Sequence, residues 1–374
     1  MGLGDSTRTD SRIRTAIFHR DTIDERTDDI MGTIAKSTRQ LAWVFDLNKC
    51  IGCQTCSVAC KVLWTHEEKG TEHQWWMTVN TQPGAGTPRD WEKMGGGYQN
   101  QKLSLGKLPT PEEFGGGWDY NYDEVLRGGH GRSVHLKKTA GSKTWGMNWD
   151  EDEGGGEFPN AYFFYLPRMC NHCTEPACVE ACPTGAMFKR EEDGLVLRDE
   201  DACQGQQQCA RACPYKKIYF NAERGVSQHC IGCFPRLEQG VAPACVRQCP
   251  GRAAFVGFLD DQGGPVHKLV TKWKVALPLH PELGTQPNVY YVPPLAPSPL
   301  REDGSFDEDG HRIPPSYLEE LFGPAVHGAL DVLRAELDNK RRGLDSEVMD
   351  QLILYQWKDC LSHLSRDPAE IVWE

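Results

Sequence analysis

The sequence lacks any long hydrophobic run. Its longest apolar stretches, Ala161–Leu166 and Ala253–Leu259, have the length of strands, far short of the roughly 18 residues that span a bilayer. Residues 1–39 contain neither the hydrophobic core of a secretory signal nor a twin-arginine pair. These absences predict a chain without a transmembrane segment of its own, folded in the cytoplasm and exported, if at all, on a partner's signal.

Several functional motifs are also missing. There is no G-x-G-x-x-G after a strand, no Walker sequence, no evident Ser/His/Asp constellation, and no C-x2-C followed by His for covalent haem. The formal net charge of −12 argues against a general nucleic-acid-binding surface. With 39% hydrophobic and 25% charged residues, the composition is typical of a globular protein.

What the chain does contain is sixteen cysteines, fifteen of them in four groups. The groups are Cys50, Cys53, Cys56 and Cys60; Cys170, Cys173, Cys178 and Cys182; Cys203, Cys209 and Cys213; and Cys230, Cys233, Cys245 and Cys249. The third group has Gln206 where the pattern would place a cysteine, and Cys360 stands alone. Disulfide frameworks join separated segments, whereas these tight spacings converge sulfurs on a metal.

The first group has the C-x2-C-x2-C-x3-C spacing of bacterial ferredoxins. Three close thiolates hold three corners of a cubane, and the last cysteine, one helical turn further on, points to a neighbouring cluster. A proline follows Cys182, Cys213 and Cys249 and ends that turn. Zinc is the alternative, but zinc ribbons use two pairs of ligands rather than repeated runs of three plus one.

The last cysteine of each group binds the cluster that is otherwise held by another group. Each group must therefore be paired with a second group. The second and third are neighbours joined by a predicted β-hairpin (Ala186–Phe188 and Leu195–Leu197), so the first and fourth pair around them. The predicted ligand sets are Cys50, Cys53, Cys56 and Cys249 for a first [4Fe-4S] cluster; Cys60, Cys230, Cys233 and Cys245 for a second; Cys170, Cys173, Cys178 and Cys213 for a third; and Cys182, Cys203 and Cys209 for a [3Fe-4S] cluster.

Other polar residues near these groups have two interpretations each. Gln206 is either a weak oxygen ligand or, as we favour, a filler beside a three-iron cluster, because an amide is a poor iron ligand. His172 is interpreted as a hydrogen-bond donor rather than a ligand, and Cys360 as a buried helix cysteine. Eight basic residues could raise cluster potentials or merely be solvated: Arg168, Lys189, Arg190, Arg211, Lys216, Lys217, Arg247 and Arg252.

The expected fold class is α+β, with two nested bacterial-type two-cluster ferredoxin modules. We predict an N-terminal extension (1–39), an outer module (40–62 and 227–260), an insertion (63–160), an inner module (161–226), and an extended segment with C-terminal helices (261–374). The insertion carries seven of the eleven tryptophans and three Gly-Gly-Gly runs, and is either a docking surface or a subdomain packed over the clusters. Strands are expected at Leu41–Asp46, Ala161–Leu166 and Ala253–Phe258.

The C-terminal part is expected to be less compact. Residues 275–315 are proline-rich and predicted to be extended and wrapped over a partner. Two amphipathic helices should follow, one carrying an apolar face from Leu318 to Leu337 and one over about residues 345–363.

The cysteine groups and the phrases DLNKCIGCQTCSVACK, YLPRMCNHCTEPACVEACP and ACPYKKIYFN resemble the iron–sulfur β subunits of the DMSO-reductase family, over roughly residues 40–299. The resemblance implies electron transfer between a molybdopterin catalytic α subunit and a haem b γ subunit or membrane cytochrome b. It also implies that the Cys50 cluster lies nearest the molybdenum and the three-iron cluster nearest the haem.

Within that family, nitrate reductases usually carry Trp at the place of Gln206, so we favour the ethylbenzene/dimethyl sulfide dehydrogenase-like branch. The alternatives are a β subunit of respiratory nitrate reductase or nitrite oxidoreductase, and a free-standing polyferredoxin carrier. The expected location is periplasmic by co-export with a signal-bearing partner; the alternative is the cytoplasmic face of the membrane.

Overall fold

The computed structural model describes residues 39–66, 68–119, 137–138, 145–148 and 153–370. The predicted extension therefore lies almost wholly outside the described residues, as do parts of the predicted insertion. Helices and strands are both short, and most strand pairs are antiparallel, which agrees with the expected mixture of α and β structure. Among the described residues, no helix is long and apolar enough to cross a membrane.

A four-stranded sheet forms the centre of the molecule, in the order β13-β1-β15-β14. Its strands are β1 (Leu41–Asp46), β13 (Ala254–Phe258), β14 (Leu277–Pro278) and β15 (Val289–Val292). All six residues of β1 are buried, because this strand has a neighbour on each side and lies within the core. β1 pairs antiparallel with β13, with Leu41 opposite Phe258, and parallel with β15, with Trp43 opposite Val289.

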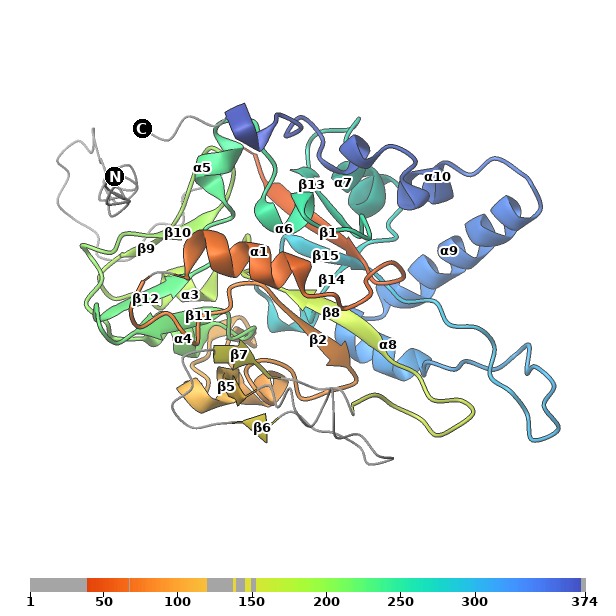
Figure 1. Ribbon diagram of the computed structural model, residues 1–374, viewed down its shortest axis with the longest axis horizontal. Helices are drawn as coiled ribbons and strands as arrows, with labels where there is room; N and C mark the ends of the chain where they lie inside the picture. The colour runs from red at the N-terminus through yellow and green to blue at the C-terminus, as the bar shows by residue number, and fades with distance from the viewer. Residues whose placement is uncertain (1–38, 67, 120–136, 139–144, 149–152, 371–374) are drawn as a thin grey trace, which may run out of the picture.

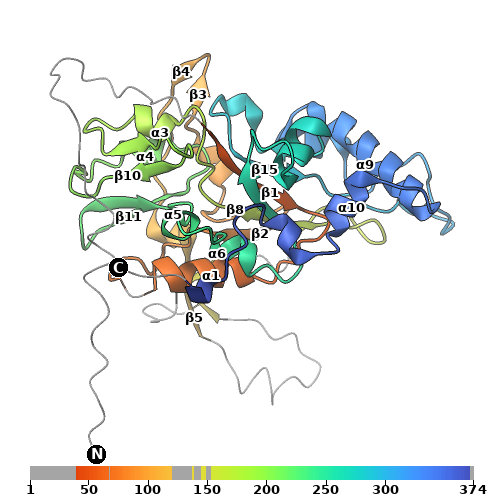
Figure 2. The same cartoon turned by 90° about the horizontal axis from the view of Figure 1, so that it is seen from above.

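Two-stranded ribbons and short helices lie to one side of this sheet, and the C-terminal helices lie to the other (Figures 1 and 2). The ribbons are β9 (Met187–Lys189) with β10 (Val196–Arg198), and β11 (Ile218–Asn221) with β12 (Val226–His229). The first of them is the hairpin predicted between the second and third cysteine groups. The short helices are α1 (Thr55–Trp64), α3 (Ala177–Glu180), α4 (Gln208–Ala212), α5 (Phe234–Leu237) and α6 (Ala244–Arg247).

The strand expected at Ala161–Leu166 is shifted: β8 spans Phe164–Arg168 and pairs with β2 (Thr78–Gln82). Its partner explains the late start, because Gln82 lies opposite Phe164 and is followed by Pro83, which has no N–H to extend the ladder. The remaining elements between α1 and β8 are small: the 3-10 helices Trp91–Met94 and Pro111–Phe114, and strands β3 (Tyr98–Gln99), β4 (Lys102–Leu103), β5 (Gly115–Asp119), β6 (Lys137–Lys138) and β7 (Trp145–Met147).

The C-terminal part differs from expectation at three places. The segment predicted to be extended over residues 275–315 contributes β14 and β15, and β15 is almost completely buried in the central sheet. The first predicted helix is broken at Gly323 into α8 (Pro315–Phe322) and α9 (Ala325–Arg341). The second ends early: α10 spans Glu347–Ile353, and Leu354 has a left-handed backbone (φ 58°).

Cys360 is buried as predicted, but it lies in a single 3-10 turn (Trp357–Cys360) instead of a long helix. Its thiol donates a hydrogen bond of 2.9 Å to the carbonyl of Trp357. The other helical pieces are α7 (Pro265–His267), the π-type turn Lys268–Lys272, and the 3-10 turns Pro281–Leu283 and Pro368–Glu370.

Candidate metal centres

The four cysteine groups begin with loops of the same backbone form. Two residues after the first cysteine of each group, φ is positive: 66° at Gly52, 42° at His172, 66° at Gly205 and 66° at Gly232. The next residue is Cys53, Cys173 and Cys233 in three of the loops and Gln206 in the remaining one. Gln206 therefore occupies the position of a ligand cysteine on a matching backbone.

The first predicted ligand set lines one cavity. Cys50, Cys53, Cys56 and Cys249 surround an empty space of about 410 Å³, with Cys245 of the second set also at its wall. This volume, and the volumes of the other cysteine-lined cavities, include open solvent at the mouth of the cavity. Burial, and then the neighbouring Cys249 and Cys53 thiols, raise the pKa of Cys50 to about 11. Cys53 is exposed, so this cavity lies at the surface of the protein.

The second set lines a separate cavity deeper in the molecule. Cys60, Cys230, Cys233 and Cys245 surround about 300 Å³ of empty space, and all four are buried. Hydrogen-bond donors already point at these sulfurs. The indole N–H of Trp64 donates to Cys233 Sγ at 3.2 Å, and the amide of Gly232 donates to Cys230 Sγ at 3.4 Å.

The third set is brought together by α3 and α4, which pack against each other. Burial raises the pKa of Cys178 well above its ordinary value, and the nearby thiols of Cys213, Cys170 and Cys173 raise it further. All four members of the predicted set are therefore neighbours, although Cys213 comes from a different cysteine group.

The three-cysteine set lines its own cavity of about 360 Å³. Cys182, Cys203 and Cys209 face it together with Gln206, whose side chain is exposed and whose Nε2 donates to Gln204 Oε1 at 3.4 Å. Burial raises the pKa of Cys209 to about 11. The structure thus offers three thiols and one solvent-facing amide around this space.

Cysteines one helical turn apart serve different cavities. Cys56 and Cys60 are both on α1, yet the first faces the 410 Å³ cavity and the second the 300 Å³ cavity. This is the geometry expected from i and i+4 positions displaced along a helix. In the described part of the chain, no three Cys, His, Asp or Glu side chains form a group that could hold a single metal ion.

Two buried histidines lie between the second and third sets. The ring of His172 stacks on Trp43 at 5.5 Å and lies 6.4 Å from the ring of His229. His172 Nδ1 accepts the amide of Val196, so its proton is on Nε2, whereas His229 Nδ1 lies 2.7 Å from the Cys230 carbonyl and must donate to it. Both Nε2 atoms are buried without a partner among the described residues.

His172 was recognised in the sequence, but His229 was not. The available signal was its position directly before a ligand cysteine. Burial, and then the charge of Lys189, lower the pKa of His172 to about 3, so the ring is a neutral donor. The hydrogen-bond donor role predicted for His172 stays a prediction, because its Nε2 has no acceptor among the described residues.

The basic residues near the cysteines separate into two kinds. Four are buried: Arg168, Lys189, Lys216 and Lys217. Arg211 and Arg252 are exposed, and Arg190 is ion-paired with Asp193 and Glu238. Only the buried kind can act strongly on a cluster, because solvent screens exposed charges.

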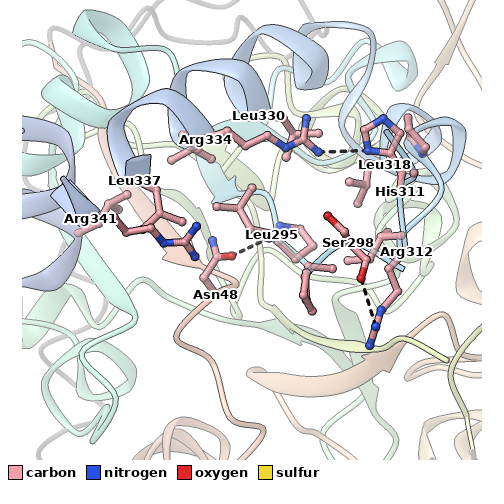
Figure 3. Close-up of a pocket in the computed structure, with 18 of the residues that line it drawn as sticks. Asn48, Leu295, Ser298, His311, Arg312, Leu318, Leu330, Arg334, Leu337 and Arg341 are labelled. Atoms are coloured by element: carbon pink, nitrogen blue, oxygen red, sulfur yellow. Dashed lines mark hydrogen bonds between the residues drawn. The ribbon is translucent and has the colours of Figure 1, made fainter. Parts of the chain in front are cut away.

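A larger groove lies between the segment at 294–313 and helices α8, α9 and α10 (Figure 3), and Lys49 lines both this groove and the cavity of the first ligand set. Its apolar wall includes Leu330 and Leu337, and Arg334 Nη2 lies 3.4 Å from His311 Nδ1 at one end. None of its lining residues is a cysteine, so it is not a site for a cluster.

The domain that contains the inner cysteine groups has a recognisable class. Residues 161–259 match the family described as "4Fe-4S dicluster domain". Together with the cavities lined by thiols, this match defines the chain as a ferredoxin-like iron–sulfur protein.

Relatives that match over most of the chain define the particular family. The chain is 54% identical over 327 residues to the selenate reductase subunit beta of Thauera selenatis, covering 86% of this chain and 98% of that protein. It is 51% identical to the dimethylsulfide dehydrogenase subunit beta of Rhodovulum sulfidophilum (85% and 97% covered) and 52% identical to the respiratory nitrate reductase subunit beta of Haloferax mediterranei (84% and 90%). The chain belongs to the iron–sulfur β subunits of the DMSO-reductase family, and is therefore an electron-transfer subunit.

Proposed function

We propose that this chain relays electrons through three [4Fe-4S] clusters and one [3Fe-4S] cluster, held by the four ligand sets described above. The observation that carries the proposal is that three of the four sets each line a cavity of their own. When bound, the clusters supply one-electron carriers within the protein. The thiols hold them, and the apolar walls around Cys60 and Cys230 exclude water from the site of the second set.

The same arrangement supports two nested modules. The cavities of about 410 and 300 Å³ combine cysteines from the first and fourth groups, and the remaining two sets combine cysteines from the second and third. α1 packs against α6 in the outer pair, and α3 against α4 in the inner pair. Each pair therefore has the crossed ligand arrangement of a two-cluster ferredoxin.

We further propose that the partners are a catalytic α subunit containing a molybdenum–pterin cofactor and a haem b γ subunit. The relatives support the first, since they are β subunits of reductases and a dehydrogenase. The ethylbenzene/dimethyl sulfide dehydrogenase-like branch and a periplasmic location by co-export remain proposals. A nitrate reductase subunit is the alternative, because the Haloferax mediterranei relative is as similar as the others.

The test is cofactor analysis of the complex, isolated without oxygen with its native partners. We expect about fifteen iron atoms per copy of this chain after the iron of the partner subunits is subtracted and, in the oxidised state, an EPR signal near a g value of about 2 from the three-iron cluster. Stoichiometric zinc with negligible iron and sulfide would contradict the proposal. Identification of the large co-purifying subunit decides between the branches.

A further inference from the structure

Two buried cations lie side by side between the second and third ligand sets. Lys217 and Arg168 are among the most completely buried large side chains of the protein. The Arg168 guanidinium stacks on the Trp91 ring at 3.5 Å and donates a hydrogen bond of 2.8 Å to the Tyr215 carbonyl. Its Nε and Nη1 atoms have no hydrogen-bond partner in the described structure.

The three hydrogen bonds of Lys217 have the pattern of a protonated ammonium. Its Nζ lies 3.1 Å from the Trp75 carbonyl, 3.1 Å from Thr78 Oγ1 and 3.0 Å from the Tyr219 hydroxyl. The Tyr219 hydroxyl donates its own proton to the Trp75 carbonyl, and Thr78 donates to the Arg168 carbonyl at 3.4 Å. All three neighbours can therefore only accept from Nζ, and an amine that donates three hydrogen bonds is a protonated ammonium.

No carboxylate of the described residues forms an ion pair with these cations, and the carboxylate that acts on Arg168, that of Glu92, lies beyond ion-pair distance. Among the described residues, neither Lys217 nor Arg168 has a carboxylate within 4 Å. An unpaired buried charge is strongly destabilising, so two adjacent ones require negative charge nearby. Burial, and then the charge of Arg168, lower the pKa of Lys217 well below its ordinary value, whereas the thiols of Cys60, Cys230 and Cys213 act in the opposite direction and favour the charged form.

The position of the Lys217 ammonium follows from its acceptors. Trp75 and Thr78 flank Met77, whose backbone N–H hydrogen-bonds to the Cys60 thiol. Lys217 is also four residues after Cys213, which belongs to the third set. The ammonium therefore faces ligands of two different clusters.

We propose that Lys217, assisted by Arg168, is a buried counter-ion shared by the second and third [4Fe-4S] clusters, and that it raises the potentials of both. The inference rests on the proposed function, because it requires the clusters. A fixed positive charge stabilises the more negative, reduced form of a cluster, and net charge is one of the determinants of cluster potential. A single residue would thus keep the potentials of two successive clusters close to each other.

Lys216 is a matched control. It is adjacent in sequence and also fully buried, and its Nζ donates to the Arg211 carbonyl at 3.0 Å. Among the thiols, only Cys213 acts on its charge, so it faces one cluster and not two.

The experiment is an EPR-monitored redox titration of the purified complex. Lys217→Met and Lys217→Gln should lower the midpoint potentials of two [4Fe-4S] signals and leave the third [4Fe-4S] and the [3Fe-4S] signals in place. Lys216→Met should lower only one. Unshifted potentials in the Lys217 variants, or an equal shift of all four centres, would overturn the proposal.

If neither neutral variant retains its iron, the Lys217→Arg variant distinguishes a role of the charge from a role of the side chain's size. Recovery of iron by this charged side chain supports the role of the charge, and its failure indicates a steric role and overturns the proposal. Absence of cluster signals from the wild-type complex would refute the proposed function itself, whereas intact signals with unshifted potentials would refute only the role of Lys217.

Discussion

At the scale of single residues, the backbone conformation at Gln206 matches that of a ligand cysteine, although its side chain is not a thiol. The loop from Cys203 to Gln206 has the same left-handed glycine as the loop from Cys50 to Cys53. A thiol at this position would therefore point where the matching loop points its ligand. The amide instead donates to Gln204 and is exposed to solvent, so under the proposed cluster assignment this position corresponds to a ligand but supplies no thiolate.

Gln206→Cys is expected to convert the three-iron centre into a four-iron centre, because it supplies the missing thiolate on an unchanged backbone. The oxidised EPR signal near a g value of about 2 should disappear, and iron should rise by about one atom per chain. Gln206→Ser is the control and should keep the three-iron signal. Retention of that signal in Gln206→Cys would show that the loop does not present this residue to the cluster.

At the scale of elements, the break between α8 and α9 depends on Gly323. Its backbone (φ 74°, ψ 175°) is in a region that is essentially restricted to glycine. A Cβ there would also lie 2.9 Å from Pro281 Cγ. The break directs α8 and α9 against the core through Leu321 and Val326.

Gly323→Ala should reduce the free energy of unfolding by about 1–3 kcal/mol, the typical cost of such strain. Gly328→Ala is the control, since this exposed glycine is in the first turn of α9 and a Cβ there meets nothing within 4 Å. It should stabilise the protein by about 0.5–1 kcal/mol. Denaturant unfolding of the two variants measures both effects, and equal effects would contradict the strain argument.

A second element-scale feature is the contact that His280 makes between two segments. Its Nε2 lies 3.2 Å from Glu92, in the 3-10 turn of Trp91, and its Nδ1 lies 2.9 Å from Glu282. Burial lowers the pKa of His280, but the hydrogen bonds and charges of the two glutamates outweigh burial and raise it above its ordinary value.

Because the pKa is raised in the folded state, the stabilising contribution of His280 is complete below the unfolded pKa of about 6.5 and is lost as the pH rises through the higher folded value. His280→Gln should therefore flatten the dependence of unfolding free energy on pH in this window. His327→Gln removes a comparable but exposed pair with Glu319 and should leave the dependence nearly unchanged. Identical profiles for wild type and His280→Gln would contradict this prediction.

At the scale of the whole molecule, the cluster cavities are part of the core. Cys60, Cys230 and Cys245 belong to the same buried cluster as Trp43 and Phe255 of the central sheet. The thiols that hold iron therefore also connect the outer ligand loops to β1 and β13.

Removal of iron by a chelator under reducing conditions is expected to lower the melting temperature substantially, because metal binding to such sites is coupled to folding. The control is the same treatment after the Cys360→Ser substitution, which removes the one thiol outside the ligand sets and should respond as the wild type does. A melting temperature independent of iron would show that the core is complete without the clusters.

Much of this protein was predictable from the order of its residues. Local spacing is retained in the folded chain, so β1, the hairpin of β9 and β10, and the turn from Cys56 to Cys60 agree with expectation. The break at Gly323 also had a sequence signal, a glycine followed by a proline, which the apolar stripe from Leu318 to Leu337 concealed. The early end of α10 had none, since no glycine or proline occurs between residues 345 and 363.

The cysteine spacing was enough to predict the chemistry, because it limits which sulfurs can reach one cluster. The other groups that surround these sulfurs could be identified only from the folded chain. The burial of β15 beside β1, the unpaired nitrogens of His172 and His229, and the three acceptors around Lys217 all depend on contacts between segments far apart in the chain. Such contacts set desolvation and charge balance, and neither is encoded in local spacing.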